Sequence, residues 1–222
     1  MNNLLELIAV CVERGKVNAK SPYPPDLKGQ DGVDELTKAA LAAGIDAQNV
    51  LEQGLIAGMN AIGARFRRDE VFVPDVLMSA KAMKTGMAHI RPYFQSGEVK
   101  RKGVFIIGTV AGDMHDIGKN LVAMVAEGGG YEVVDLGIDV ATEEFLDAVA
   151  QRPDAVVGMS ALLTTTMINM AASVRAMKEK YPHTRIMVGG APVTEHFAQE
   201  IGADSYSADP QGAVDYLNAV VA

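Results

Sequence analysis

An aspartate and a histidine stand two residues apart in the segment GTVAGDMHDIGKN, residues 108–120. The segment follows a short run of β-branched and apolar residues and precedes a helical pattern, so Asp113 and His115 fall on a strand-to-helix turn. A histidine that binds a metal usually donates its second ring N–H to a carboxylate, and an Asp-x-His turn supplies that pair locally. A zinc site needs three or four protein ligands, and no second ligand stands near His115. A metal at His115 would therefore bring its other ligands with it, as a tetrapyrrole-like cofactor does.

The glycines of the same segment do not form a nucleotide-binding motif. The turn lacks G-x-G-x-x-G and the Walker pattern G-x-x-x-x-G-K-[ST]. Gly118, Lys119 and Asn120 resemble the end of a Walker motif, but asparagine replaces the required hydroxyl residue and the upstream glycine spacing fails. Both nucleotide interpretations are therefore set aside.

Strand and helix patterns alternate from residue 103 to residue 222. They predict a five-stranded parallel sheet covered by helices on both faces, a doubly wound fold of the flavodoxin or Rossmann type. Thr142 is the expected N-cap of the second helix. In such a sheet the carboxyl ends of the strands form the ligand-binding edge, where residues 108–120, 160–166 and 189–192 should converge. The expected strands lie at 103–109, 131–137, 154–162, 184–193 and 204–208, and the helices at 118–130, 141–152, 164–181, 194–203 and 209–222.

Residues 1–95 show helical periodicity and predict a four-helix bundle, and residues 96–102 form a polar linker to the second domain, 103–222. The third helix should start after Asp46 as N-cap and run through Arg67, and Pro74 fits the first turn of the fourth. The apolar stripe of the fourth helix is expected at Val76, Leu77, Ala80, Met83 and Met87. The apolar stripe of the third helix is expected at Val50, Leu51, Leu55, Met59 and Ile62.

Composition excludes several function classes. The formal charge is −8 and no basic block occurs, which argues against nucleic acid and against an anionic membrane surface. The apolar N-terminal stretch is interrupted by Glu6 and has no basic residues before it, so neither a signal peptide nor a membrane span is expected. A cytoplasmic location follows by default. The single cysteine, Cys11, is expected to be a small buried hydrophobic residue.

Three short motifs resemble those of a known family. D-x-H-x-x-G at Asp113, His115 and Gly118 is followed by S-x-L at residues 160–162 and by G-G at residues 189–190. This pattern and its gaps resemble the cobalamin-binding domains in which a histidine replaces the cofactor's own base. In the helical half, MNAIGARFRRDEVFVPDVLMSAKAM resembles the cap module of cobalamin-dependent methyltransferases. Together they resemble the corrinoid protein of a methyltransferase system, similar to the cobalamin module of methionine synthase.

The resemblance implies a role for each matching residue. His115 would be the lower axial cobalt ligand, Asp113 would hydrogen-bond to it and set its proton content, and Thr166 would complete the relay. The glycine pair would leave room for the displaced nucleotide tail. Phe66 and Val73 of the cap would shield the upper face, which Glu52 would approach. The remaining predicted cofactor-binding residues are Ser160 and Thr164, which would line the slot for the tail, Leu162 of the S-x-L motif, the glycines Gly189 and Gly190, Ala208 at the corrin edge or tail, and the turn residues Gly112, Met114, Asp116 and Gly118.

Each of these residues also has a structural interpretation. Asp113 could be a turn or capping residue, although Asp116 is better placed for that role. Ser160 and the threonines 164–166 could cap the following helix, and the glycine pair could serve only a sharp strand exit. Phe66 and Val73 could belong to the bundle core, and Glu52 could be an ordinary surface carboxylate.

The implied function is a methyl carrier whose cobalamin cycles between Co(I) and methyl-Co(III). A substrate-specific methyltransferase would load the methyl group, a second methyltransferase would pass it to tetrahydrofolate or another one-carbon acceptor, and a reductive activation protein would restore Co(I). The linker would act as a hinge for the cap. Alternatives are the cobalamin-binding subunit of an adenosylcobalamin mutase, a cobalamin-responsive regulator, and a flavodoxin-like or receiver-like domain that binds no corrin.

Overall fold

The computed structural model describes residues 2–221, apart from the side chains of residues 2 and 95, and the chain divides into two compact units. The first comprises residues 2–101 together with 128–130, and the second comprises 102–127 and 131–221. The predicted linker lies at this boundary, and most of it packs on the helical unit. Val99 is buried and its amide donates to the carbonyl of Tyr93 at 3.1 Å. None of the helices formed by residues 2–221 is long and apolar enough to cross a membrane.

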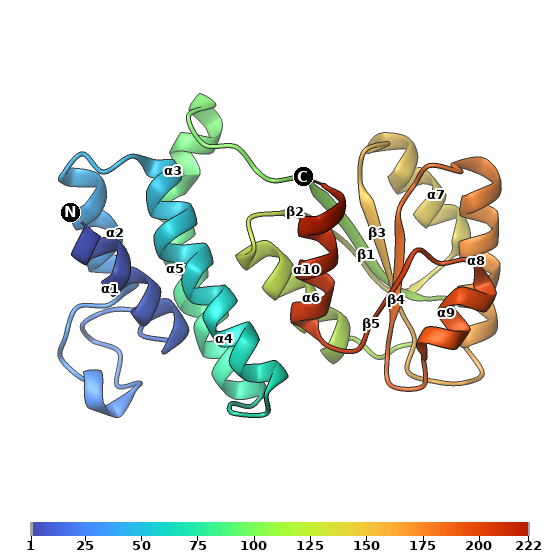
Figure 1. The fold of residues 1–222 in the computed structure, drawn as a ribbon, viewed down its shortest axis with the longest axis horizontal. Coiled ribbons are helices and arrows are strands. Elements are labelled where there is room, and N and C mark those ends of the chain that lie inside the picture. Colours follow the sequence, from blue (N-terminus) through green and yellow to red (C-terminus); the bar gives the residue numbers. More distant parts are fainter. Residues whose placement is uncertain (1, 222) are drawn as a thin grey trace. The chain divides into compact units, whose positions relative to one another are not determined.

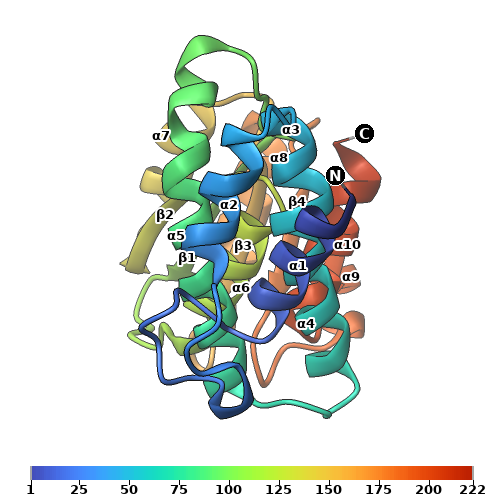
Figure 2. The same ribbon diagram turned by 90° about the vertical axis from the view of Figure 1, so that its left-hand side faces the viewer.

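The first unit is a helical bundle, as predicted (Figure 2). Helix α1 packs against α2 and α4, and α5 also packs against both, so the four long helices surround one core. Cys11 is buried, as expected. The helical elements are α1 (Asn2–Glu13), η1 (Pro25–Leu27), α2 (Val33–Ala42), α3 (Ala47–Asn49), the π-helical η2 (Val50–Ile56), α4 (Ala57–Arg67) and α5 (Val73–Ser96).

The elements α3, η2 and α4 follow one another without a break and form the long third helix that the sequence predicts. Asp46 is its N-cap, because its side chain accepts the amide hydrogen of Asn49 at 3.1 Å. A stretch of π-helix in the middle was not predicted from the pattern. The predicted stripe is confirmed, because all five of its residues are at most 1% exposed, namely Val50, Leu51, Leu55, Met59 and Ile62.

Helix α5 begins at Val73, so Pro74 lies in its first turn as predicted. Val76 and Met83 are buried, but Leu77 is 42% exposed, and its assignment to the buried stripe is wrong. Leu77 follows Val76 by one residue, which rotates it by about 100° around the helix and away from the core-facing side.

The second unit confirms the predicted doubly wound fold. All four strand pairs are parallel, and the sheet order is β2-β1-β3-β4-β5 (Figure 1). The strands are β1 (Val104–Val110), β2 (Glu132–Val140), β3 (Val156–Ser160), β4 (Ile186–Gly189) and β5 (Ser205–Ser207). The helices are α6 (Ile117–Gly128), α7 (Thr142–Gln151), α8 (Met167–Lys180), α9 (Glu195–Ile201) and α10 (Pro210–Val220).

Helices α7, α8 and α9 cover one face of the sheet, and α6 and α10 cover the other (Figure 1). A cluster of buried apolar side chains fills the first face, including Phe145, Met170 and Val174. The strand order reverses direction between β1 and β3, and in this topology ligands bind at the carboxyl ends of those two strands. The loops after β1 and β3 therefore form the expected site.

The predicted N-cap of α7 is wrong by one residue. Ala141 occupies the N-cap position, and its amide donates to the side chain of Glu144 at 3.0 Å. The hydroxyl of Thr142 lies 2.8 Å from that of Ser173 on α8 instead. Strand β2 also continues to Val140, three residues beyond its predicted end.

Candidate functional site

The turn after β1 holds the Asp113–His115 pair in the geometry that the spacing predicts. The side chain of Asp113 is 0% exposed, and its Oδ1 lies 2.7 Å from Nδ1 of His115. The same oxygen accepts the backbone amide hydrogen of His115 at 3.1 Å. The His115 side chain is 50% exposed, and its Nε2 makes no hydrogen bond to any residue that the structure describes. The ring is thus oriented by a buried carboxylate and presents one nitrogen outward.

The second oxygen of Asp113 is held by the loop after β3. It accepts hydrogen bonds from the amides of Leu162 at 2.7 Å and Leu163 at 3.2 Å, and from the hydroxyl of Thr166 at 2.7 Å. Burial alone would raise the pKa of Asp113, but these bonds and those from His115 hold it well below its usual range. Asp113 is therefore a carboxylate that can accept the ring N–H of His115.

Thr166 occupies the N-cap position of α8, but its side chain makes no capping hydrogen bond. Its hydroxyl lies 2.7 Å from Asp113 and 2.8 Å from the carbonyl oxygen of Leu163. A hydroxyl has one proton, and a carboxylate is the stronger acceptor, so the bond to Asp113 is favoured. The structure therefore does not support a helix-capping role for the Thr166 side chain.

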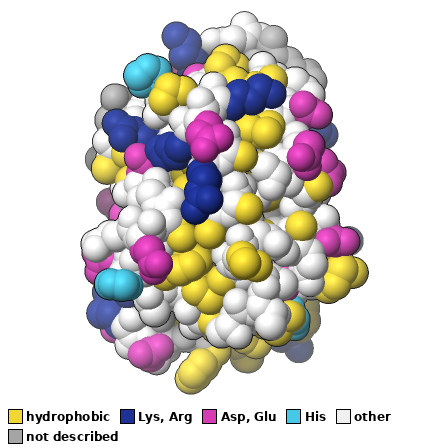
Figure 3. All heavy atoms as spheres, turned by 90° about the vertical axis from the view of Figure 1, so that its right-hand side faces the viewer, with side chains coloured by type: hydrophobic (Ala, Val, Ile, Leu, Met, Phe, Trp, Pro, Cys, Tyr) yellow, Lys and Arg dark blue, Asp and Glu magenta, His cyan; other side chains and the backbone are white. Residues whose placement is uncertain are grey.

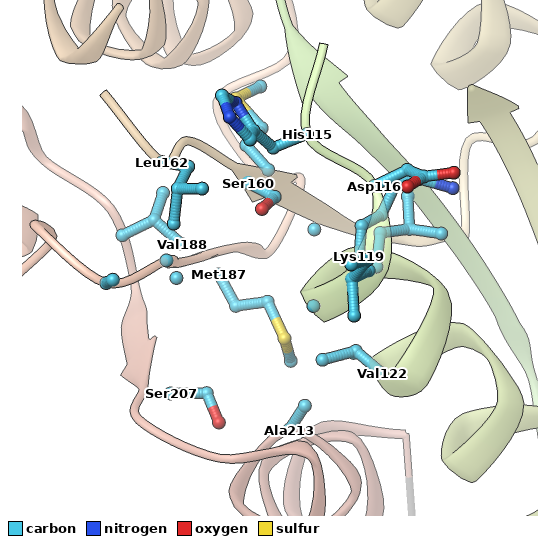
Figure 4. Close-up of a pocket in the computed structure, with 18 of the residues that line it drawn as sticks. His115, Asp116, Lys119, Val122, Ser160, Leu162, Met187, Val188, Ser207 and Ala213 are labelled. Carbon is cyan, nitrogen blue, oxygen red and sulfur yellow. The ribbon is translucent and has the colours of Figure 1, made fainter. Parts of the chain in front are cut away.

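A cavity of about 680 Å³ lies between the sheet and the helices α6 and α10. Figure 4 shows His115 at one end, with Ser207 and Ala213 at the other, Met187 of β4 on one side and Val122 of α6 opposite. The inner wall is apolar and includes Phe105, Ile107, Val122, Met187 and Ala213.

Gly118 lines this cavity, and no atom lies within 4 Å of the position that its Cβ would take. The glycine therefore leaves space that a larger side chain would fill. The size and apolar lining are those of a small-molecule site.

Apolar side chains surround the exposed ring of His115 at the carboxyl edge of the sheet. Figure 3 shows hydrophobic side chains gathered in the lower half of the face formed by this unit and charged side chains mainly in its upper half. Among the residues that the structure describes, the large exposed hydrophobic residues of this unit all lie in or beside the loops at this edge: Met114, Ile117, Ile138, Leu162, Leu163 and Ile168. An exposed apolar rim of this kind marks a binding surface.

Within residues 2–221, no group of three or more His, Cys, Asp or Glu side chains could hold a metal ion. A single histidine with an outward nitrogen suits a metal that arrives in an organic ring, which supplies its other ligands. The apolar rim suits the flat surface of such a ring, and the cavity beside it suits a chain attached to the ring.

Comparisons with known proteins agree with this geometry. Two family models, both described as B12 binding domain, match residues 103–214 and residues 30–91. Trimethylamine corrinoid protein 1 of Methanosarcina acetivorans is 40% identical over 191 residues, which cover 84% of this chain and 88% of that protein. The chain belongs to the corrinoid proteins of methyltransferase systems.

Two solved structures resemble the whole chain. The methanol:cobalamin methyltransferase complex from Methanosarcina barkeri contains a chain that is 29% identical, with a TM-score of 0.81 and coverage of 99% of this chain and 80% of that one. A cobalamin-binding protein from Desulfitobacterium hafniense DCB-2 is 28% identical, with a TM-score of 0.77 and coverage of 100% and 98%. The family assignment decides against a flavodoxin-like or receiver-like domain that binds no corrin, and favours a methyltransferase system over a mutase or a regulator.

The structure of this corrinoid protein brings most of the predicted site residues together. Asp113 contacts His115 and accepts a hydrogen bond from Thr166, and Gly112 of the same turn has a left-handed φ of +81°. Asp116 immediately precedes α6, but its side chain accepts a hydrogen bond from the side chain of Asn120 at 2.9 Å and caps no backbone amide. The predicted residues that line the cavity are Met114, His115, Asp116, Gly118, Ser160, Leu162, Gly189, Gly190 and Ala208.

Gly189, the last residue of β4, and Gly190 after it have a structural reason as well. A Cβ on Gly190 would stand 1.8 Å from the carbonyl oxygen of Ala161, and its φ is +127°. A Cβ on Gly189 would stand 2.9 Å from the carbonyl oxygen of Ser207. The neighbouring backbone thus leaves no room for a Cβ at residue 190, so glycine is required there whether or not a ligand binds.

One residue that was predicted to line the slot does not lie at the cavity. Thr164 is exposed and does not line it. In the helical unit, Phe66 and Val73 are half-buried on either side of the α4–α5 turn. Glu52 is exposed and accepts a hydrogen bond from the side chain of Gln48 at 2.6 Å. It lies roughly 20 Å along the helix from Phe66, at about 1.5 Å per residue.

One charged pair beside the cavity was missed by the sequence reasoning. Lys119 is buried, and its Nζ lies 2.6 Å from Oδ1 of Asp135 on β2 and 2.6 Å from Oδ1 of Asn120. In the sequence, Lys119 stands out only as part of a failed Walker motif. Its position four residues after the turn histidine gives no sign of a partner sixteen residues away.

Proposed function

We propose that this corrinoid protein is a methyl carrier, which accepts a methyl group from a small substrate through a partner methyltransferase and passes it to a one-carbon acceptor such as tetrahydrofolate. The observation that carries the proposal is the outward Nε2 of His115, fixed by buried Asp113 within an apolar rim. Bound cobalamin would supply a cobalt that accepts a methyl group as Co(I) and donates it as methyl-Co(III).

His115 would hold the cobalt through Nε2. Its Nδ1 would donate to Asp113, which fixes the ring tautomer and raises the basicity of the outward nitrogen. The metal-free ring is half exposed, so its orientation rests mainly on this bond and on the backbone of the turn.

Asp113 and Thr166 would control the proton on His115. Asp113, whose Oδ1 lies 2.7 Å from Nδ1, would accept the ring N–H of His115 and so hold the proton on that nitrogen. The hydroxyl of Thr166 and the two loop amides keep Asp113 charged throughout. These contacts would therefore leave Nε2 of His115 without a proton and available to a metal.

The cavity would hold the displaced nucleotide tail of the cofactor. Its apolar wall suits an aromatic base, and Ser160, Ser207 and Asp209 supply polar groups along it. Gly118 leaves the space in which the tail would lie. Phe66 and Val73 of the helical unit would exclude water from the methyl-bearing face.

The partners would be a substrate-specific methyltransferase, an acceptor methyltransferase and a reductive activation protein, and the location would be the cytoplasm. A relative at 40% identity is named a trimethylamine corrinoid protein, and a similar solved chain belongs to a methanol:cobalamin methyltransferase complex. Methylated amines and methanol are therefore the donor classes to test first.

The test uses the corrinoid-loaded chain, reduced chemically and mixed with ¹⁴C-methyl donors and the methyltransferase specific for each. We expect the protein-bound corrinoid to gain label from one donor class and to release it to tetrahydrofolate or a thiol when an acceptor methyltransferase is added. The loaded His115→Ala variant serves as the control and should gain or release label more slowly. A wild-type protein that retains corrinoid but gains no label from trimethylamine, dimethylamine, monomethylamine or methanol would contradict the proposal.

A further inference from the structure

The edge strand β2 is irregular beside the histidine turn. Its pairing with β1 shifts twice, because Ile107 pairs with Asp135, Gly108 with Gly137, and Val110 with Val140. Two extra residues of β2 are thereby accommodated as bulges, with φ of +90° at Gly137 and +53° at Asp139. Bulges re-aim side chains and are frequent beside functional sites.

Asp139 lies in this irregular part of the strand and makes two hydrogen bonds to the turn, one through its side chain and one through its backbone amide. Its Oδ1 accepts the amide hydrogen of Gly112 at 2.6 Å, and its own amide donates to the carbonyl oxygen of Asp113 at 3.0 Å. Gly112 has a left-handed φ of +81° and stands three residues before His115. Asp139 therefore fixes the point at which the chain turns to present Asp113 and His115.

Two other side chains hold the same turn at different points. The hydroxyl of Thr109 donates to the carbonyl oxygen of His115 at 2.9 Å, and Nδ2 of Asn169 donates to that of Ala111 at 2.7 Å. Thr109 lies in β1 and Asn169 in α8, whereas Asp139 reaches the turn from the edge strand.

Packing does not explain an aspartate at residue 139. Its side chain is exposed, so it contributes little to the core. Its left-handed backbone would be adopted most easily by glycine. The carboxylate oxygen that accepts from Gly112 is the feature that glycine lacks.

We propose that Asp139 is a positioning residue for His115: through Gly112 it holds the turn in the conformation that presents Nε2 to the metal. The inference rests on the proposed role of His115 as the cobalt ligand. Asp139, an edge-strand residue twenty-seven positions after Gly112, would thus help to orient the metal ligand.

The test compares two variants that both tolerate the left-handed backbone. Asp139→Gly removes the acceptor, and Asp139→Asn keeps an acceptor oxygen and is the matched control. In the metal-free chain, NMR hydrogen exchange should show the Gly112 amide exchanging about tenfold faster in D139G, and near the wild-type rate in D139N. The thermal midpoint of D139G should stay near that of the wild type, since glycine suits this φ.

The second readout is the Co(II) electron paramagnetic resonance spectrum of the loaded protein with ¹⁵N-labelled histidine. We expect the equilibrium constant for histidine coordination to fall about tenfold in D139G and to stay near the wild-type value in D139N. Full histidine coordination in D139G, or an equal loss in D139N, would overturn the positioning role. If the wild-type spectrum does not change with the label, His115 is not the cobalt ligand, and the proposed role of Asp139 in positioning that ligand fails too. The amide exchange would then show only that Asp139 holds the turn.

Discussion

Replacing Thr166 by valine keeps the branched shape of a buried side chain and removes the hydroxyl that donates to Asp113 at 2.7 Å. A hydrogen bond to a charged acceptor contributes about 1.5–3 kcal/mol. The added methyl group offsets up to about 0.8 kcal/mol of that loss. Asp113 keeps its bonds from Leu162, Leu163 and His115, so we expect a net loss of about 1–2 kcal/mol in the free energy of unfolding at pH 7.

The loss should depend on pH in a defined direction. The folded-state pKa of Asp113 is depressed, so the stabilisation from its bonds is complete above the ordinary aspartate pKa of about 3.9 and is lost as the pH falls through the folded-state value. Removing one of these bonds raises that folded-state pKa back toward the ordinary value. Acid unfolding of the sheet unit should therefore begin at a higher pH in T166V than in the wild type.

Thr166→Ser is the matched control, since it keeps the hydroxyl and loses only a methyl group. Its stability loss should be independent of pH, whereas that of T166V should shrink in strong acid. The assay is native-state hydrogen exchange of the β1 amides at pH 7, combined with circular dichroism during titration to pH 1.5. Equal acid-unfolding midpoints for T166V and T166S would refute the assignment of the Thr166 bond to charged Asp113.

Two further substitutions test the cavity and a second carboxylate. Gly118→Leu should lower corrinoid affinity more than about tenfold by filling the cavity, yet leave the thermal midpoint unchanged or higher because leucine favours a helix over glycine. Titration of the metal-free chain with cobalamin, followed by absorbance, measures this, and unchanged affinity would contradict the position of the tail. Burial raises the pKa of Asp204, but hydrogen bonds from Lys178 at 2.6 Å and the Ile186 amide at 2.7 Å outweigh it and lower the pKa overall. Asp204→Asn should therefore lower the free energy of unfolding, measured with urea, by about 1–2 kcal/mol at pH 7 and by less at pH 2. The difference arises because this stabilisation is lost as the pH falls through the folded-state pKa of Asp204. Equal losses at pH 7 and pH 2 would contradict the stabilising role of the charged carboxylate.

Local patterns predicted the long helices and the five strands of this chain, but not the π-helical stretch within the third helix. Alternating β-branched runs and helical stretches indicated five strands and five helices after residue 103, and Asp46 and Pro74 marked helix starts correctly. These signals lie within a few residues of the features that they specify. Leu77 shows the limit, because a one-residue difference on a helix decides between core and solvent.

The Asp113–His115 contact could be predicted because the two residues are neighbours on one turn. Thr166 is 53 residues from Asp113, and only the family resemblance suggested it. The Lys119–Asp135 and Gly112–Asp139 contacts depend on the register of β2 against β1, with two bulges. No local pattern specifies such a register, so these contacts required the structure.

The most direct test of the account is the electron paramagnetic resonance spectrum of the cobalamin-loaded Co(II) protein, recorded with natural-abundance and with ¹⁵N-labelled histidine. The account predicts that the nitrogen splitting of the cobalt signal changes with the label in the wild type. The change should disappear in His115→Ala and persist in His183→Ala, whose histidine is an exposed residue that does not line the main cavity. A protein that binds cobalamin with a splitting that ignores the label would contradict His115 as the metal ligand.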